Sequence, residues 1–125
     1  MPEESFICKI QGKVIKGSQY GRKIGFPTIN IDRRFFLKLK QKPKFGIYAG
    51  TVEISNKNYR AAIVIGPKDI RGIPKIEAHI IGFSGDAYRK KAVIFAEKFI
   101  RNFKKFKSEK ELIRQIEKDI LIAKK

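Results

Sequence analysis

The sequence predicts a mainly β domain, either a closed barrel or a sandwich, followed by a C-terminal helix. Short stretches of apolar and β-branched residues alternate with Gly and Pro turns over the first two-thirds of the chain. The last segment instead carries apolar side chains at helical spacing. The 125 residues suffice for one domain and hardly for two, and 42% of them are hydrophobic. Ten Phe and no Trp predict a core rich in phenylalanine.

Five stretches have the composition of strands and are bounded by turn residues. They are residues 6–14, 26–31, 46–54, 59–65 and 75–83. Residues 55–57 (Ser-Asn-Lys) form a turn signal, so the stretches on either side of it predict a hairpin. Alternation in the last stretch puts Glu77 and His79 on the face opposite the apolar Ile76 and Ala78.

Residues 88–103 fit two structures. Helical spacing is matched by Ala92, Phe95, Ala96, Phe99, Ile100 and Phe103. Val93 and Phe95 also fit a β-strand, so the spacing favours a helix only slightly and the choice stays open on the residues alone.

The C-terminal segment predicts a helix packed on the barrel. Ser108 and Glu111 stand at the spacing of a capping box. One helical stripe follows, made of Leu112, Ile113, Ile116 and Ile120.

The chain is strongly basic. Twenty-nine Lys and Arg oppose twelve Asp and Glu, for a net charge of +17, which suits a partner that carries several phosphates. The basic residues are nevertheless spread out, even where they are densest, in residues 33–44 and 101–125. This distribution is typical of a solvated surface, so we do not expect a nucleic-acid partner.

The remaining composition fits a reducing cytoplasm, and we expect a monomer. No apolar run approaches the roughly 18–20 residues that span a bilayer, so no membrane partner is expected. Residues 1–5 are acidic and polar, unlike a signal peptide. The single cysteine, Cys8, lies between Ile7 and Ile10 and is expected to be a buried apolar residue.

The most informative stretch is residues 12–30. Four glycines, at positions 12, 17, 21 and 25, are spaced through a basic segment that ends in Phe26-Pro27. Glycine turns present successive backbone N–H groups that bind anions. Thr28 and Asn30 then offer neutral oxygens suited to a hard cation such as Mg²⁺. A phosphate cradle beside a metal-ligand pair is what phosphoryl transfer requires.

These residues resemble the signature of ATP-dependent riboflavin kinases. Other pieces of the family occur in the same order, at residues 43–50, 61–66, 76–80, 85–88, 99–101, 105–108 and 115–119. The resemblance spans about residues 9–120 and makes residues 1–125 a single riboflavin-kinase-like domain. It implies a six-stranded antiparallel Greek-key β-barrel with a C-terminal α-helix, and a strand at least over residues 92–95.

The resemblance also implies a reaction. The γ-phosphoryl group of ATP would pass to the 5′-hydroxyl of riboflavin, giving FMN and ADP, with Mg²⁺ or another divalent cation. In many bacteria this unit is the C-terminal half of a bifunctional protein that also makes FAD. That half is absent from this sequence, so we expect a stand-alone kinase or an excised domain, with FAD formation left to a separate adenylyltransferase.

Roles for individual residues follow from the same resemblance. The nucleotide would be bound by Gly17, Gly21, Arg22, Lys23, Gly25, Pro27 and Thr28. Thr28 and Asn30 would hold the metal, and Glu77 would act as the base on the riboflavin hydroxyl. Glu77, Arg101 and Phe106 would contact the flavin, although Phe106 also suits the core. His79 is expected to be a packed, hydrogen-bonding residue.

Three departures from the family pattern leave two alternatives open. The loop 66–74 lacks the family's Thr, Gly82 and Arg89 replace the usual Asp and Gly, and Phe103 replaces a Glu. The alternatives are a catalytically weak module that binds flavin or nucleotide, and a small basic β-barrel that binds nucleic acid.

Overall fold

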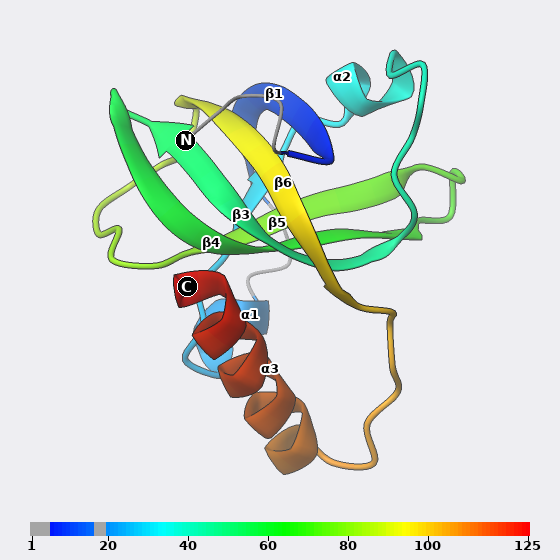
Figure 1. The fold of residues 1–125 in the computed structure, drawn as a ribbon, viewed down its shortest axis with the longest axis vertical. Coiled ribbons are helices and arrows are strands. Elements are labelled where there is room, and N and C mark those ends of the chain that lie inside the picture. The colour runs from blue at the N-terminus through cyan, green and yellow to red at the C-terminus, as the bar shows by residue number, and fades with distance from the viewer. Residues whose placement is uncertain (1–5, 17–19) are drawn as a thin grey trace.

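Six strands close into an antiparallel barrel in the computed structural model, which describes residues 6–16 and 20–125 (Figure 1). The strands are β1 (Cys8–Ile15), β2 (Ile29–Ile31), β3 (Gly46–Ile54), β4 (Lys57–Lys68), β5 (Pro74–Ile80) and β6 (Lys91–Arg101). Their order around the barrel is β1-β2-β5-β4-β3-β6. Because β6 returns to lie beside β3 after the β3-β4-β5 meander, the connection is a Greek key. The predicted fold is confirmed.

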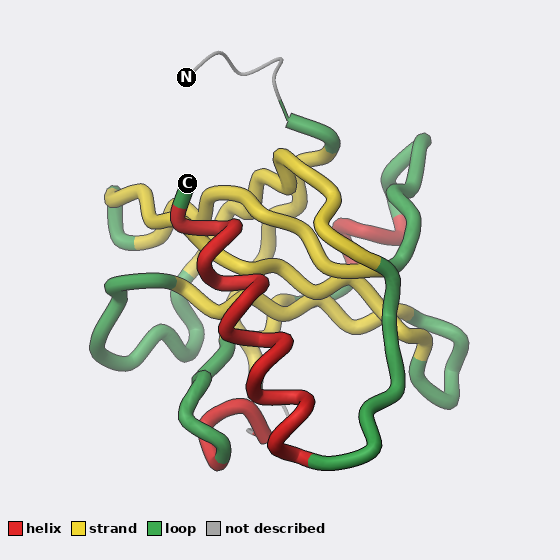
Figure 2. Tube along the Cα trace, turned by 60° about the horizontal axis from the view of Figure 1, so that its bottom comes forward, coloured by secondary structure: helices red, strands yellow, loops and turns green. Residues whose placement is uncertain are grey.

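Three helices accompany the barrel in the described part of the chain. Two are single turns that were not predicted, α1 (Tyr20–Lys23) and α2 (Arg34–Leu37), and the third is α3 (Glu109–Lys124). Figures 1 and 2 show α3 lying against the outside of the barrel, with α1 on the same side. Ala123 of α3 packs there on Ala49 of β3 and Ala62 of β4. None of the described helices is long and apolar enough to cross a membrane.

The predicted N-cap of α3 is confirmed, and the second bond of the capping box is displaced by one residue. The Ser108 hydroxyl accepts a hydrogen bond from the Glu111 amide at 3.2 Å. The Glu111 carboxylate accepts from the Lys107 amide at 3.2 Å, one residue before the cap.

Residues 91–101 form a strand, so the slight preference of the spacing for a helix was wrong. Ala92, Ile94 and Ala96 are fully buried inside the barrel, and β6 pairs with both β1 and β3. The register with β3 shifts between Ile47 and Tyr48 and again between Ala49 and Gly50. Such irregularities break the two-residue alternation and produce a spacing that imitates a helix.

The core is built from isoleucine rather than phenylalanine, which corrects the prediction from composition. Among the described residues, the fully buried large side chains are Tyr48, Phe36, Ile10, Ile31, Ile54, Ile63, Ile65, Ile76, Ile94 and Val52. Other phenylalanines, such as Phe45, Phe83 and Phe99, are only partly buried and pack around this cluster. A six-stranded barrel has a narrow interior, which stiff β-branched side chains fill well.

Two predicted strand ends differ from the structure. The stretch 26–31 is a strand only from Ile29 to Ile31. The stretch 75–83 ends its strand at Ile80, because Gly82 turns the chain with φ 83°. Within β5, Glu77 and His79 lie outside the barrel and Ile76 and Ala78 inside, as alternation predicted.

Arg89 stands where the family has Gly, and its φ of 70° is a conformation that favours glycine. We therefore expect Arg89→Gly to raise the free energy of unfolding by up to about 1 kcal/mol, the relieved strain exceeding the added entropy of the unfolded chain. Denaturant unfolding measures this. The same change at Lys91, which lies in β6 and has no positive φ, should destabilise. If both variants lost the same free energy of unfolding, the backbone at Arg89 would not be strained.

Candidate functional site

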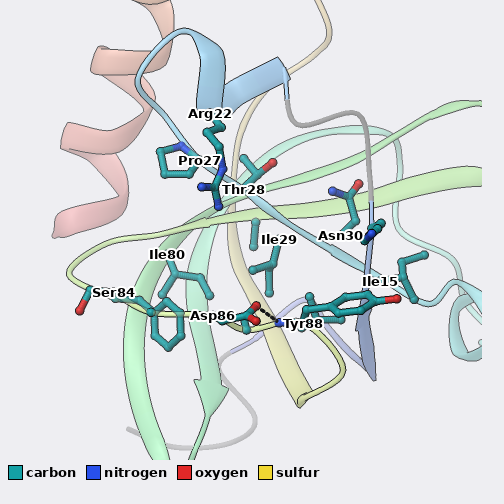
Figure 3. Close-up of a pocket in the computed structure, with 16 residues that line it drawn as sticks. Ile15, Arg22, Pro27, Thr28, Ile29, Asn30, Ile80, Ser84, Asp86 and Tyr88 are labelled. Atoms are coloured by element: carbon teal, nitrogen blue, oxygen red, sulfur yellow. Dashed lines mark hydrogen bonds between the residues drawn. The ribbon is translucent and has the colours of Figure 1, made fainter.

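A cavity of about 740 Å³ opens beside β2, between the glycine-rich segment and residues 83–88 (Figure 3). Its lining residues are Val14, Ile15, Lys16, Arg22, Pro27, Thr28, Ile29, Asn30, Ala78, Ile80, Phe83, Ser84, Gly85, Asp86, Ala87 and Tyr88. The lining thus combines apolar side chains with polar ones on both sides of the cavity, Arg22 and Asn30 on one side and Ser84 and Asp86 on the other, a combination that can orient a ligand.

Four residues that were predicted to bind nucleotide or metal line this cavity together: Arg22, Pro27, Thr28 and Asn30. Gly25 turns the chain toward them with φ 96°, and its amide donates to the Arg22 carbonyl at 3.3 Å. Lys23 is exposed and is not part of the lining. Gly17 lies outside the described residues, and Gly21 belongs to the short helix α1.

Asn30 and Glu77 are direct neighbours across two strands. Asn30 of β2 is the Cα partner of Glu77 in β5 and of Ile15 in β1. Partners in an antiparallel ladder point their side chains to the same face, so the Asn30 amide and the Glu77 carboxylate lie side by side on the outside of the barrel. Glu77 is not itself among the lining residues, although Ala78 and Ile80 of the same strand are, so Glu77 stands at the edge of the cavity.

The carboxylate of Glu77 is largely enclosed. Its side chain is 14% exposed, and Oε2 lies 3.3 Å from the Lys75 ammonium. A carboxylate that is this little exposed needs such a partner or a substrate, because burying it alone costs free energy.

His79 holds the segment that leads into Thr28 and Asn30. Its Nδ1 lies 2.8 Å from the Pro27 carbonyl, and its ring meets the Phe26 ring edge-on with centroids 6.0 Å apart. Since a carbonyl only accepts, Nδ1 carries the proton in this contact. The expectation of a packed, hydrogen-bonding histidine is confirmed, and its effect is to hold residues 26–27 against β5.

The wall formed by residues 83–88 was not predicted as part of the site. The Asp86 carboxylate accepts from the Tyr88 amide at 2.9 Å, which makes a tight turn. The Tyr88 ring faces the cavity and lies near two cations, the Lys16 ammonium at 5.7 Å and the Arg89 guanidinium at 5.2 Å from its centroid. The Gly85-Asp86-x-Tyr88 sequence was the available signal, since a tight turn ending in an aromatic residue suits a pocket wall.

Arg101 is bound to α3 and does not line the cavity. Its Nε donates to Asp119 Oδ1 at 3.0 Å and its Nη2 to Oδ2 at 2.8 Å. Asp119 is 3% exposed and also accepts from the Gln115 amide at 3.0 Å. Phe106 is half-buried, with its ring centroid 5.8 Å from the Arg101 guanidinium. The two residues therefore stand together at the junction of β6 and α3.

A belt across the outside of the barrel connects Glu77 to this junction. Glu77 is the Cα partner of Val64, Val64 of Ile47, and Ile47 of Arg101. The two positions between the carboxylate and the arginine are therefore apolar, with Val64 partly exposed and Ile47 6% exposed. A flat aromatic ligand needs apolar contacts of this kind.

The donor set suits a magnesium ion that arrives with a nucleotide. In the described ranges, no three His, Cys, Asp or Glu side chains gather as a metal cluster. The Thr28 hydroxyl and the Asn30 amide oxygen are neutral hard donors on one side of the cavity. Mg²⁺ commonly takes one or two protein ligands and completes its shell with phosphate oxygens and water. These residues therefore fit the ion.

The altered loop 66–74 is tied to Arg33, the residue before α2. Asp69 Oδ2 accepts from the Arg33 guanidinium at 2.6 Å, and Asp69 Oδ1 accepts from the Arg71 and Ile73 amides at 2.8 and 3.1 Å. The bond from Arg33, with the amide of Ile73 in support, lowers the pKa of the Asp69 carboxyl to about 2.

This depressed pKa predicts an acid dependence of stability. The Asp69 carboxylate should stabilise the fold fully above its ordinary pKa of 3.8, and the contribution should disappear as the pH falls toward about 2. Thermal unfolding of the wild type and of Asp69→Asn, from pH 2 to pH 6, measures it, and the two melting curves should converge at the acid end. Arg33→Gln should remove most of the difference. A pH-independent difference would contradict the assignment.

The buried ion pair between Arg101 and Asp119 predicts a large mutational effect. Asp119→Ala leaves the guanidinium without its partner and should cost about 3 kcal/mol in the free energy of unfolding. Glu117→Ala, at an exposed position of the same helix, should change it by less than about 0.5 kcal/mol. Urea unfolding checks both. A loss at Asp119 no larger than at Glu117 would mean that this pair does not hold α3.

Comparison with known proteins points to one family. The family model for flavokinase, described as riboflavin kinase, matches residues 5–125. The bifunctional riboflavin kinase/FMN adenylyltransferase of Buchnera aphidicola subsp. Schizaphis graminum (strain Sg) is 39% identical over 123 residues, 93% of this chain and 38% of that protein. The Bacillus subtilis (strain 168) protein of the same name is 36% identical over 115 residues, 88% of this chain and 35% of that protein. The chain therefore spans little more than a third of these relatives.

Two solved structures are also similar. The riboflavin kinase from Trypanosoma brucei superposes with a TM-score of 0.64 at 27% identity, covering 92% of this chain and 76% of that one. A Streptococcus pneumoniae protein titled a macrolide-efflux protein superposes with a TM-score of 0.81 at 30% identity, covering 92% of this chain and 38% of that one. Because the family model matches nearly the whole sequence, the chain belongs to the riboflavin kinase family.

Proposed function

We propose that this chain transfers the γ-phosphoryl group of ATP to the 5′-hydroxyl of riboflavin, giving FMN and ADP, and that residues 1–125 form the one domain that does so. The observation that carries the proposal is the adjacency of Asn30 and Glu77 on β2 and β5. It puts a candidate metal ligand and a candidate base next to each other at the edge of the cavity. Phosphoryl transfer depends mainly on such positioning and on charge neutralisation.

The nucleotide is assigned to the cavity. Arg22 supplies positive charge to the phosphates there, together with the turn at Gly25. Thr28 and Asn30 hold the metal that accompanies the phosphates, and the bound cation would neutralise phosphate charge. Phe83 and Tyr88 contribute aromatic rings to the cavity, and such rings suit the nucleoside.

Glu77 is assigned to the acceptor. Its carboxylate takes the proton of the riboflavin 5′-hydroxyl as that oxygen bonds to the γ-phosphorus. The bond from the γ-phosphorus to the bridging oxygen breaks at the same time, and ADP leaves with that oxygen.

The flavin ring is assigned to the apolar belt beyond Glu77. Val64 and Ile47 form its floor, and Arg101 and Phe106 close the far end next to α3. Because Arg101 is already bound to Asp119 and its Nη1 donates to the Asn102 carbonyl at 3.2 Å, its contribution is to fix α3 as one wall of the flavin site. The substrates, ATP and riboflavin, place this activity in the cytoplasm, and the site needs residues of one copy of the chain only.

The proposal predicts that Glu77→Gln lowers kcat by about 10²- to 10⁴-fold, because the amide cannot accept the proton. Asn30→Ala should also reduce activity strongly. Glu53→Gln, an exposed carboxylate on β3, is the matched control and should leave kcat unchanged. A coupled assay of FMN formation, run with ATP, CTP and GTP in parallel, measures all three variants and the donor preference.

Two outcomes would overturn the proposal. A purified chain that forms no FMN with any donor and any divalent metal would not be a kinase, and riboflavin binding without ATP consumption would then support a binding module. Full activity in Glu77→Gln would remove Glu77 as the base.

A further inference from the structure

Lys75 is an unassigned cation on the face of the barrel that carries Glu77. It lies two residues before Glu77 in β5, so both side chains point outward, and its ammonium lies 3.3 Å from the Glu77 carboxylate. The Lys75 side chain is 48% exposed, whereas that of Glu77 is 14% exposed. The lysine side chain therefore has room to move, whereas the carboxylate beside it is enclosed.

The type of cation distinguishes this pair. Six ion pairs occur among the described residues, and the cation is Arg in five of them. Arginine binds a carboxylate through a rigid planar fork, while lysine is a point charge on a flexible stem that exchanges partners readily. A cation that holds a fold is better supplied by arginine, and one that changes partner is better supplied by lysine.

The backbone just before Lys75 is held by hydrogen bonds to Arg33, which follows β2. Arg33 follows Asn30 by three residues, and its guanidinium donates to the Ile73 carbonyl at 3.3 Å and to Asp69 at 2.6 Å. The start of β5 is thereby tied to the end of β2. Lys75 follows Ile73 by two residues and precedes Glu77 by two, so its stem begins at a point of the backbone that these bonds hold.

Among the described residues, Lys75 is the cation that pairs with Glu77. Across the sheet, Glu77 faces the neutral Asn30 of β2 and the apolar Val64 of β4. On its own strand the next outward residue is His79, whose Nδ1 is bound to the Pro27 carbonyl. Arg101, farther along the belt, is bound to Asp119.

We infer that Lys75 is a charge-compensating residue of the phosphoryl transfer, and the inference rests on the proposed function. In the free protein its ammonium holds the Glu77 carboxylate in place. When the triphosphate arrives, the same ammonium screens the carboxylate from the phosphate charge, which would otherwise repel it. It then contacts the oxygens of the transferred group while Glu77 takes the hydroxyl proton. Lys75 neither gains nor loses a proton in this sequence.

The test is a steady-state comparison of three variants. Lys75→Met keeps the aliphatic stem and removes the charge, and should lower kcat roughly tenfold with little change in the KM for riboflavin. Lys75→Arg keeps the charge and should restore most of kcat. Lys57→Met, at an exposed position of β4 remote from Glu77, is the control and should match the wild type. Thermal unfolding of each variant reports its folding.

A double-mutant cycle separates this role from a structural one. If Lys75 acts through Glu77, Lys75→Met should cost little more in a Glu77→Gln background, where the carboxylate is already absent. An active wild type in which Lys75→Met keeps its kcat, or loses it only together with folding, overturns the role of Lys75 and leaves the proposed function standing. A wild type that forms no FMN overturns both.

Discussion

The short strand β2 closes the barrel, and the site depends on this closure. It contains three residues, and it pairs through two Cα partners with β1 and two with β5. So short a strand is held in register by its flanks, where the Pro27 carbonyl is bound by His79 and the Asp32 amide donates to the Lys13 carbonyl at 3.0 Å. A slip of one residue would turn Asn30 into the barrel and away from Glu77. Closure therefore sets the geometry between the two candidate substrates.

Several arginines of this basic chain hold its elements together, and one lysine has a different position. Arg60 donates to the Ala123 carbonyl at 2.8 Å and to Glu97 at 2.7 Å, so it ties the end of α3 to the barrel. Arg101 holds the same helix through Asp119, and Arg33 holds the loop 66–74. These guanidinium groups fasten elements around the site, each at a partly buried pair. Lys75 instead keeps a half-exposed charge beside the carboxylate.

Most of the fold followed from the sequence, and the failures have physical causes. Alternation in β5 and the N-cap of α3 were read correctly, since both depend on local rules. The strand β6 was ambiguous because its bulges disturb the alternation, and the family resemblance resolved it. The core was misjudged because composition does not reveal how narrow a barrel interior is. In the site, Arg22, Pro27, Thr28 and Asn30 do line one cavity, but their roles stay predictions. The cavity wall at residues 83–88 was not predicted, because only folding brings that turn opposite β2.

The most direct test of the central claim is a structure of this chain with ADP, Mg²⁺ and riboflavin bound. The account predicts the Thr28 and Asn30 oxygens on the metal and the Glu77 carboxylate within about 2.6–3.2 Å of the riboflavin 5′-hydroxyl. The phosphates should lie in the cavity beside β2, and the flavin ring on Val64 and Ile47. A nucleotide bound elsewhere, or a riboflavin hydroxyl on the far side of the barrel from Glu77, would contradict it.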